Sequence, residues 1–440
     1  MPGDIIVKGG PLWAGPGQEW PQGLVAARQG KIIFAGPEDD YHAAQKPDRI
    51  LDVEGGLILP GLVNAHCHGA MVLFRGLSDD LPLDKWLQDV MFPVEGRWVN
   101  EEMVELCTLL AAGEMLLSGT TCVADSYFCA LGAARAYERA GMRAQVSQGV
   151  IDFPAPGAPD PAAKLEVCRD FVAACRQCGP LVSPGLFAHS LYTCSPQTLT
   201  DIASLAHGLG VPWFTHLAET KGEVATVKER YGRTPVRHLK ELGVLDSLQA
   251  GVHGIWTDAE EWGHLSENQV ALIHCPESNL KLASGAGEPT GWLRAGLCVG
   301  LGTDGAASNN DLDLIGEMGM AARLAKVSRM DPAALPAEQA LDMALTGSAA
   351  ALGMADLLGR LEPGYAADLI VINLDTPHLT PWFDVPSALT YAARGSDVRH
   401  VVVAGELVVQ DRQVLTIDLN EVMAKVQGLA GQVQEDLSEG

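Results

Sequence analysis

The sequence predicts an α/β fold, a (β/α)8 TIM-type barrel joined to a small β-sandwich domain built from both chain ends. Two observations carry this prediction. Eight short apolar runs alternate with helix-length segments through the middle of the chain, and β-rich segments flank that middle on both sides. Alternating strands and helices indicate a parallel sheet, and eight units are the number that closes a barrel.

Both ends of the chain lack the strand–helix alternation of the middle region. Short β-rich runs broken by glycines fill residues 4–36 and return over residues 361–417, and residues 418–440 have the pattern of an acidic amphipathic helix. At 440 residues the chain exceeds what one hydrophobic core usually covers. We therefore expect a discontinuous small β domain of residues 1–58 and 361–440, and a barrel of residues 59–360.

The eight strand candidates of the middle region are short and apolar. They are residues 61–68, 120–127, 143–152, 181–190, 211–219, 249–256, 269–276 and 297–305. Helical patterns separate most of them, for example residues 101–119 and 195–210. A doubly wound open sheet is the structural alternative to the closed barrel.

Composition narrows the classes of function. Hydrophobic residues make up 47% of the chain and charged residues 19%, as in a packed globular protein. The formal net charge of −25 repels phosphate backbones and anionic lipid, so we expect no nucleic-acid or membrane partner. Ten irregularly spaced cysteines and no secretory signal pattern at the N-terminus predict reduced thiols and a cytoplasmic location.

Polar residues gather at the carboxyl ends of the predicted strands, where barrel active sites lie. Six of the twelve histidines stand there, with Glu219 and Asp304: His66, His68, His189, His216, His253 and His274. A single strand-end histidine is usually structural, but six of them are hard to explain by packing. Buried polar groups cost free energy unless they are partnered, and a metal ion supplies such a partner.

Neutral imidazoles with a carboxylate favour zinc or iron(II) over calcium or magnesium. Residues two apart in a strand point the same way, so His66 and His68 share the barrel-facing side. Together with His216 and Asp304 they would form a site with room left for water. A bound divalent cation lowers the pKa of such a water to roughly 7.

Two further groups stand beside these ligand candidates. Glu219 follows His216 by three residues and is placed as a proton shuttle. His253 and Asp304 are candidates to orient or deprotonate the water.

Competing motifs lack their partners. The stretch "GLGTDG" at 300–305 is formally G-x-G-x-x-G, but no second strand ending in a ribose-binding acid follows it. The stretch "SNLK" at 278–281 matches S-x-x-K, but S-D-N and K-T-G are absent.

Four stretches together resemble a known superfamily: "PGLVNAHCH", "THLAET", "HCPESNLKLASG" and "GTDGAASNNDLDLIGE". They resemble the amidohydrolase superfamily and, within it, the 5-methylthioadenosine/S-adenosylhomocysteine deaminases. The resemblance covers essentially the whole chain, including "GKIIFAG" near the start and "LEPGYAADLIVI" near the end. H-x-H alone is a weak signal, but its combination with the later strand-end residues in order is strong.

The resemblance implies one divalent metal held by His66, His68, His216 and Asp304, with zinc first and iron or manganese served by the same ligands. Members with two metals bridge them through a modified lysine on strand four. The fourth strand here carries no lysine and ends at His189, which favours one metal.

The resemblance also implies roles in catalysis and substrate binding. Glu219 would protonate the purine ring, His253 would assist the attacking hydroxide, and His189 would contact the base. Glu95 matches a position that binds ribose hydroxyls, and Trp86 matches an aromatic wall beside the nucleoside. For Glu95 and Trp86, surface charge and loop packing remain alternative explanations.

The implied reaction is hydrolytic deamination of an adenine nucleoside, with 5′-methylthioadenosine first and S-adenosylhomocysteine, adenosine and 5′-deoxyadenosine after it. Family members that take S-adenosylhomocysteine are expected to hold its carboxylate with arginines after strand three. Residues 147–164 contain Gln148 and no arginine, and Arg143 at the strand start is expected to be structural. We therefore predict a preference for small or apolar 5′ substituents.

Three questions stay open at this stage. A guanine- or chlorotriazine-type hydrolase would use the same metal ligands. The loops that line the substrate pocket, and not these ligands, distinguish such an enzyme from a nucleoside deaminase. A non-catalytic scaffold would lack ligands that are present here. Barrels of this superfamily commonly self-associate, so the resemblance leaves a homo-oligomer open.

Overall fold

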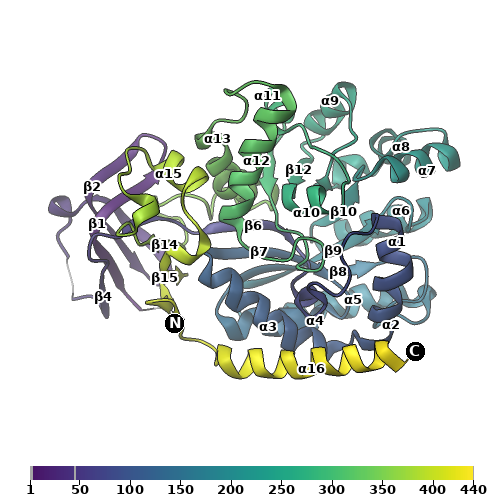
Figure 1. Ribbon diagram of the computed structural model, residues 1–440, viewed down its shortest axis with the longest axis horizontal. Helices are drawn as coiled ribbons and strands as arrows, with labels where there is room; N and C mark the ends of the chain where they lie inside the picture. The colour runs from purple at the N-terminus through teal and green to yellow at the C-terminus, as the bar shows by residue number, and fades with distance from the viewer. Residues whose placement is uncertain (1–2, 44–45, 440) are drawn as a thin grey trace.

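The computed structural model describes residues 3–43 and 46–439, and it confirms the predicted fold class. A β domain built from both ends of the chain lies beside a barrel of strands surrounded by helices (Figure 1). The two expected parts are therefore both present. The boundaries given above for the two domains remain a prediction.

The barrel consists of eight neighbouring strands, each paired in parallel with the next. They are β6 Leu62–Cys67, β7 Thr120–Tyr127, β8 Arg143–Val150, β9 Val182–Ser190, β10 Trp213–Leu217, β11 Ala250–His253, β12 Ala271–His274 and β13 Val299–Leu301. Each lies inside one of the eight predicted runs. A parallel bridge between Cys67 and Asp304 joins the first strand to the segment after the last, so the sheet is closed and the doubly wound alternative is wrong.

Helices surround this cylinder and bury its outer face. They are α1 Leu83–Lys85, α2 Phe92–Trp98, α3 Glu101–Leu117, α4 Ala130–Ala140, α5 Lys164–Cys175, α6 Pro196–Leu209, α7 Lys221–Tyr231, α8 Pro235–Leu242, α9 Ala259–Glu267, α10 Pro276–Lys281, α11 Pro289–Arg294, α12 Leu314–Arg329, α13 Ala337–Asp342, α14 Ser348–Ala351 and α15 Val385–Tyr391. Two helices match the predicted patterns closely. α3 starts where the Asn100 side chain accepts a hydrogen bond from the Met103 N–H, and α6 starts at an equivalent Ser195 cap.

The β domain is a nine-stranded mixed sheet. Its strands are β1 Ile5–Gly15, β2 Gln18–Arg28, β3 Lys31–Pro37, β4 Arg49–Asp52, β5 Leu57–Pro60, β14 Leu369–Ile372, β15 Val398–Val403, β16 Glu406–Gln410 and β17 Gln413–Val414. The chain ends meet where β5 pairs with β1 on one side and with β14 on the other. Buried Val7, Ile58 and Val371 belong to the apolar core that this sheet encloses.

The last helix, α16 Leu419–Glu439, runs along the barrel beside α3 (Figure 1). Asp436 on this helix accepts hydrogen bonds from the side chains of Arg97 and Trp98, both at 3.2 Å. The predicted amphipathic helix at the end of the chain is thereby confirmed. Within the described residues, α16 included, no helix has the length and apolar character needed to cross a membrane.

A buried ion pair ties the barrel to the β domain. Arg143, at the start of β8, donates two hydrogen bonds to Asp368, which precedes β14, at 2.9 and 3.0 Å. Asp368 also accepts the N–H of Ala404 at 2.7 Å. Both charged residues are buried, so each neutralises a charge that water cannot reach. The structural role predicted for Arg143 is confirmed.

Replacing Arg143 by methionine should destabilise the protein by about 3–5 kcal/mol, because Asp368 would be left buried and unpaired. Urea unfolding followed by circular dichroism measures the loss. The matched control is Arg135→Met, since the Arg135–Glu101 pair is half exposed and should contribute about 0–1 kcal/mol. A double change, Arg143→Met with Asp368→Leu, should recover much of the loss. Equal effects of Arg143→Met and the control would contradict the assignment.

Candidate active site

Four side chains converge at the carboxyl end of the barrel: His66, His68, His216 and Asp304. Each offers one ligand atom, and these atoms all lie within 4.8 Å of one another. The Nε2 atoms of His66 and His216 are 3.3 Å apart. Asp304 Oδ1 lies 3.5 Å from His66 Nε2 and 3.2 Å from His68 Nε2. The structure thus brings together all four predicted ligand candidates, from β6, β10 and the turn after β13.

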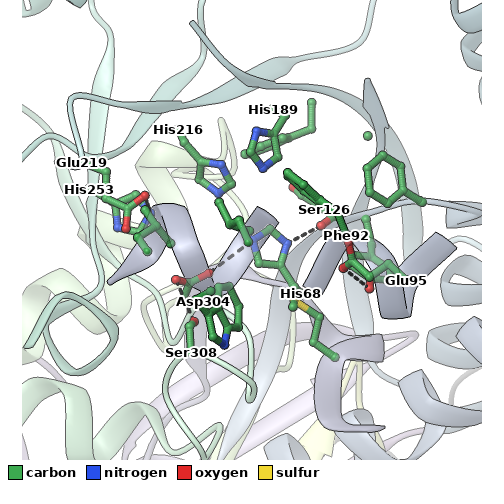
Figure 2. Close-up of a pocket in the computed structure, with 18 of the residues that line it drawn as sticks. His68, Phe92, Glu95, Ser126, His189, His216, Glu219, His253, Asp304 and Ser308 are labelled. Carbon is green, nitrogen blue, oxygen red and sulfur yellow. Dashed lines mark hydrogen bonds and ion pairs between the residues drawn. The ribbon is translucent and has the colours of Figure 1, made fainter. Parts of the chain in front are cut away.

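Hydrogen bonds to neighbouring residues orient two of these groups, His68 and Asp304. The His68 Nδ1–H donates to the carbonyl oxygen of Ser126, which leaves Nε2 free as a ligand atom (Figure 2). Asp304 Oδ2 accepts the hydroxyls of Ser278 at 2.7 Å and Ser308 at 3.1 Å, so that Oδ1 alone faces the histidines.

The electrostatics suit a divalent cation. Burial lowers the pKa of His66 to about 4 and the pKa of His216 well below its ordinary value, so both rings are neutral at pH 7. Burial opposes ionisation of Asp304, but its hydrogen bonds with His66 and His68 keep its pKa well below the usual range. Three imidazoles and one carboxylate, all buried except the partly exposed His68, form a donor set suited to a divalent transition metal.

Glu219 and His253 lie next to this cluster on the same cavity wall (Figure 2). His253 Nε2 is 3.8 Å from Glu219 Oε2. Burial raises the pKa of Glu219, which favours a protonated carboxyl that can donate. The predicted proton shuttle and its histidine neighbour are therefore side by side.

The sequence reasoning missed Glu223, which fixes the backbone under Glu219. The Glu223 carboxylate accepts the N–H of Ala218 at 3.0 Å and the N–H of Glu219 at 2.8 Å. Ala218 needs this support because its φ of +50° lies in the left-handed region. Thr220 and Glu223 form a T-x-x-E pattern at the start of α7, which is the readable signal that could have identified Glu223.

The other expected substrate residues line the same cavity. His189 lies beside His216, with ring centres 5.0 Å apart, and its Nδ1 is 2.9 Å from the hydroxyl of Thr193. Trp86 begins a π-helical turn, Trp86–Met91, between α1 and α2. π turns occur frequently at functional sites because they displace side chains from the regular helical pattern.

Glu95 is buried on α2 and accepts a hydrogen bond from the Tyr127 hydroxyl at 2.6 Å. Burial raises the pKa of Glu95 to about 7, while the bond from Tyr127 opposes that rise. Its carboxyl faces the cavity (Figure 2), so the surface-charge alternative for Glu95 is wrong. No single stretch of sequence signals the partnership with Tyr127, because 32 positions separate the two residues.

Two polar residues near the strand ends lie outside the cavity lining. His274 is fully buried and packs its ring edge-on against Trp292, with centres 5.6 Å apart. Gln148 turns back on the barrel, accepting the N–H of Ala130 and donating to the carbonyl oxygen of Gly149. Only its neighbours Gly149 and Val150 line the cavity on this side.

A closed barrel with histidines and an aspartate at its carboxyl-end mouth defines a metal-dependent hydrolase. A model of the amidohydrolase family matches residues 57–408. The chain belongs to the amidohydrolase family.

Similar proteins narrow the class. The chain is 44% identical to a 5-methylthioadenosine/S-adenosylhomocysteine deaminase of Syntrophobacter fumaroxidans over 97% of both chains. It is 42% identical to the protein of that name from Moorella thermoacetica, over 96% of this chain and 98% of the relative. This chain is therefore an enzyme, a hydrolytic deaminase of that family.

Solved structures agree with the fold. An adenosine deaminase from Xanthomonas campestris with bound zinc superposes with a TM-score of 0.94 at 36% identity, covering 98% of this chain and 99% of that one. The atrazine chlorohydrolase TrzN from Arthrobacter aurescens, at 23% identity and a TM-score of 0.88 over 97% of this chain and all of that one, shows the fold alone.

The purified protein should carry about one equivalent of divalent metal, since the four donors enclose a single point. His216→Ala and Asp304→Ala should each lose it, as measured by plasma mass spectrometry after dialysis. His189→Asn is the control, because this histidine lines the cavity without belonging to the cluster. Full metal retention by both ligand variants would refute the assignment.

Proposed function

We propose that this enzyme deaminates an adenine nucleoside, with 5′-methylthioadenosine as the favoured substrate and adenosine, 5′-deoxyadenosine and S-adenosylhomocysteine after it. The proposal rests on one observation: a single cavity contains both the groups suited to the reaction and the groups suited to binding a nucleoside. Glu219 and His253 lie against the ligand cluster, to which Asp304 itself belongs. The groups suited to a nucleoside line the rest of the cavity: His189, Glu95 and Trp86.

Deamination adds water to C6 of the purine and expels ammonia. His66, His68, His216 and Asp304 would hold a divalent cation, which would lower the pKa of water to about 7 and so make hydroxide available at neutral pH. The Glu219 carboxyl, whose pKa burial raises, donates a proton to the ring nitrogen beside C6. His253, with Nε2 at 3.8 Å from Glu219, and Asp304 take the proton of the attacking water. That proton passes through Glu219 to the amine, which leaves as ammonia. The second proton of the water, left on the C6 oxygen, returns to Glu219 as the carbonyl forms, so that the protonated carboxyl is restored.

The nucleoside would be held by groups of two kinds. His189 is neutral, since burial lowers its pKa to about 3, and a neutral ring can share a hydrogen bond with a purine nitrogen. The Glu95 carboxyl, which faces the cavity, would form hydrogen bonds with the ribose hydroxyls. Trp86 presents its ring to the cavity while its indole N–H donates to the carbonyl oxygen of Ser78 at 3.1 Å.

Apolar side chains make up much of the remaining wall of the cavity: Leu83, Leu87, Phe92, Phe128 and Val150. Among the described residues that line the cavity, none is lysine or arginine. A methylthio group can bury its surface there, whereas an amino-acid tail would bring a carboxylate with no cation to receive it. This contrast supports methylthioadenosine over S-adenosylhomocysteine.

Zinc is the metal we propose, with iron(II) and manganese as alternatives that the same ligands accept. We also propose a cytoplasmic location. All ten cysteines are free thiols, as a reducing compartment would keep them.

Glu219→Gln should lower kcat by about 10²–10⁴-fold, because the amide cannot deliver a proton, and should leave the metal content unchanged. Ammonia release from methylthioadenosine measures the rate. Glu267→Gln, at the exposed end of α9, is the matched control and should behave as wild type. Wild-type rates for Glu219→Gln would eliminate the proposed shuttle.

The ratio of kcat/KM for methylthioadenosine over S-adenosylhomocysteine should be about tenfold or more, which corresponds to about 1.4 kcal/mol. A 5′-butylthio analogue separates the length of the tail from its charge, and it should react more like methylthioadenosine. A ratio below one would contradict the preference. Activity on guanine or a chlorinated triazine without activity on adenine nucleosides would favour the rival hydrolases.

A further inference from the structure

The short helix α10 and the turn after it lie behind the proton-handling side chains. Asn279, on α10, is fully buried, and its Oδ1 accepts a hydrogen bond from His253 Nδ1 at 2.9 Å. Ser284, just after the helix, donates its hydroxyl to Glu219 Oε1 at 3.1 Å. Two groups that the proposed chemistry needs, on different strands, are thus held from one segment of nine residues, 276–284.

The backbone of that segment couples the two holding residues. The N–H of Ser284 donates to the carbonyl oxygen of Asn279 at 2.9 Å, and the N–H of Ala283 donates to that of Leu280 at 3.1 Å. Ala283 has a φ of +51°. This pattern is a Schellman motif, in which the C″ N–H and the C3 carbonyl close the helix end. Asn279 and Ser284 are therefore fixed relative to each other by the helix cap itself.

The same segment is anchored at both sides. Ser278 donates to Asp304 Oδ2 at 2.7 Å. Lys281 donates to the carbonyl oxygen of Ala307 at 3.1 Å and pairs with Asp79 at 2.6 Å. These contacts tie α10 to the loop that carries Asp304 and to the chain before α1.

The Asn279 contact also determines which nitrogen of His253 carries the proton. An amide oxygen accepts only from a protonated nitrogen, so Nδ1 holds the hydrogen and Nε2 presents its lone pair. Nε2 is the atom that faces Glu219. The ring is held in this orientation on strained backbone, since His253 has a φ of +76°.

We infer that Asn279 and Ser284 are positioning residues for deamination, which hold His253 in its Nδ1–H tautomer and aim the Glu219 carboxyl from one helix cap. The inference rests on the function proposed above. It gives Asn279 and Ser284 of the "SNLKLAS" stretch a use beside that of Ser278, which donates to Asp304.

Double-mutant cycles test whether each residue acts through its partner. Asn279→Leu and Ser284→Ala should each lower kcat by about 10- to 100-fold with little change in KM, as expected for groups that orient a reacting side chain. In a His253→Gln background, Asn279→Leu should cause no further loss, and in a Glu219→Gln background Ser284→Ala should cause none. The crossed pair, Ser284→Ala with His253→Gln, is the control and should show an additional loss.

Conservative variants separate positioning from folding. Asn279→Asp retains an oxygen that can accept from Nδ1, and Ser284→Thr retains the hydroxyl, so both should recover most of the lost kcat. Unchanged metal content in all variants shows that the cluster is intact. Wild-type kcat in both Asn279→Leu and Ser284→Ala, or full additivity in the matched cycles, would overturn the inference.

The tautomer of His253 can be read without any substrate. Nitrogen-15 spectra of the histidine rings, assigned by difference from His253→Gln, should show a protonated Nδ1 in wild type and in Asn279→Asp but not in Asn279→Leu. A protonated Nε2 in wild type would mean that the amide faces the other way, and would refute the inference. If no adenine nucleoside is turned over while this signature is present, the proposed function fails and the hydrogen bond stands.

Discussion

Closure of the barrel is the constraint on which the site depends. His66 and His68 lie on the first strand and Asp304 follows the last, so they meet only because the sheet returns to its starting edge. The contact that closes the sheet, which we call the seam, is a backbone hydrogen bond in which the Asp304 N–H donates to the His66 carbonyl oxygen at 3.0 Å. Gly302 permits this approach, since a Cβ there would lie 2.8 Å from that same oxygen.

Burial then gives each group its protonation state. Burial lowers the pKa values of His66 and His189 and raises that of Glu219, which favours neutral imidazoles and a protonated carboxyl. Burial opposes the charged forms of Asp304 and His68 as well, but the contact between them, 3.2 Å from Oδ1 to Nε2, lowers the pKa of Asp304 and raises that of His68. Desolvation therefore sets the direction of the pKa shift at most of these groups, and close contact with an opposite charge decides the exceptions.

The strands and the ligand set could be predicted from the sequence because both are local or periodic. H-x-H places His66 and His68 on one side of a strand, and parallel strands bring their carboxyl ends together whatever the loops do. Contacts between side chains that are far apart in the sequence produce no local or periodic pattern. The pairing of Tyr127 with Glu95 and of Asn279 with His253 depends on side-chain direction in the folded state. His274 is another residue whose surroundings the sequence does not reveal. It stands at a strand end like the ligand histidines, but its ring packs against Trp292.

Chemistry and substrate selection occupy different parts of the fold. The ligands and acid–base groups sit at strand ends, where packing on both faces leaves little freedom to move. Trp86 and Glu95 come instead from the segment of α1, the π turn and α2, inserted between β6 and α3. A change in that segment alters the cavity wall without disturbing the seam or the cluster. Because the cavity residues suited to meet a 5′ substituent lie on the inserted segment and around Val150, we expect the 5′ preference proposed above to depend on that part of the cavity wall.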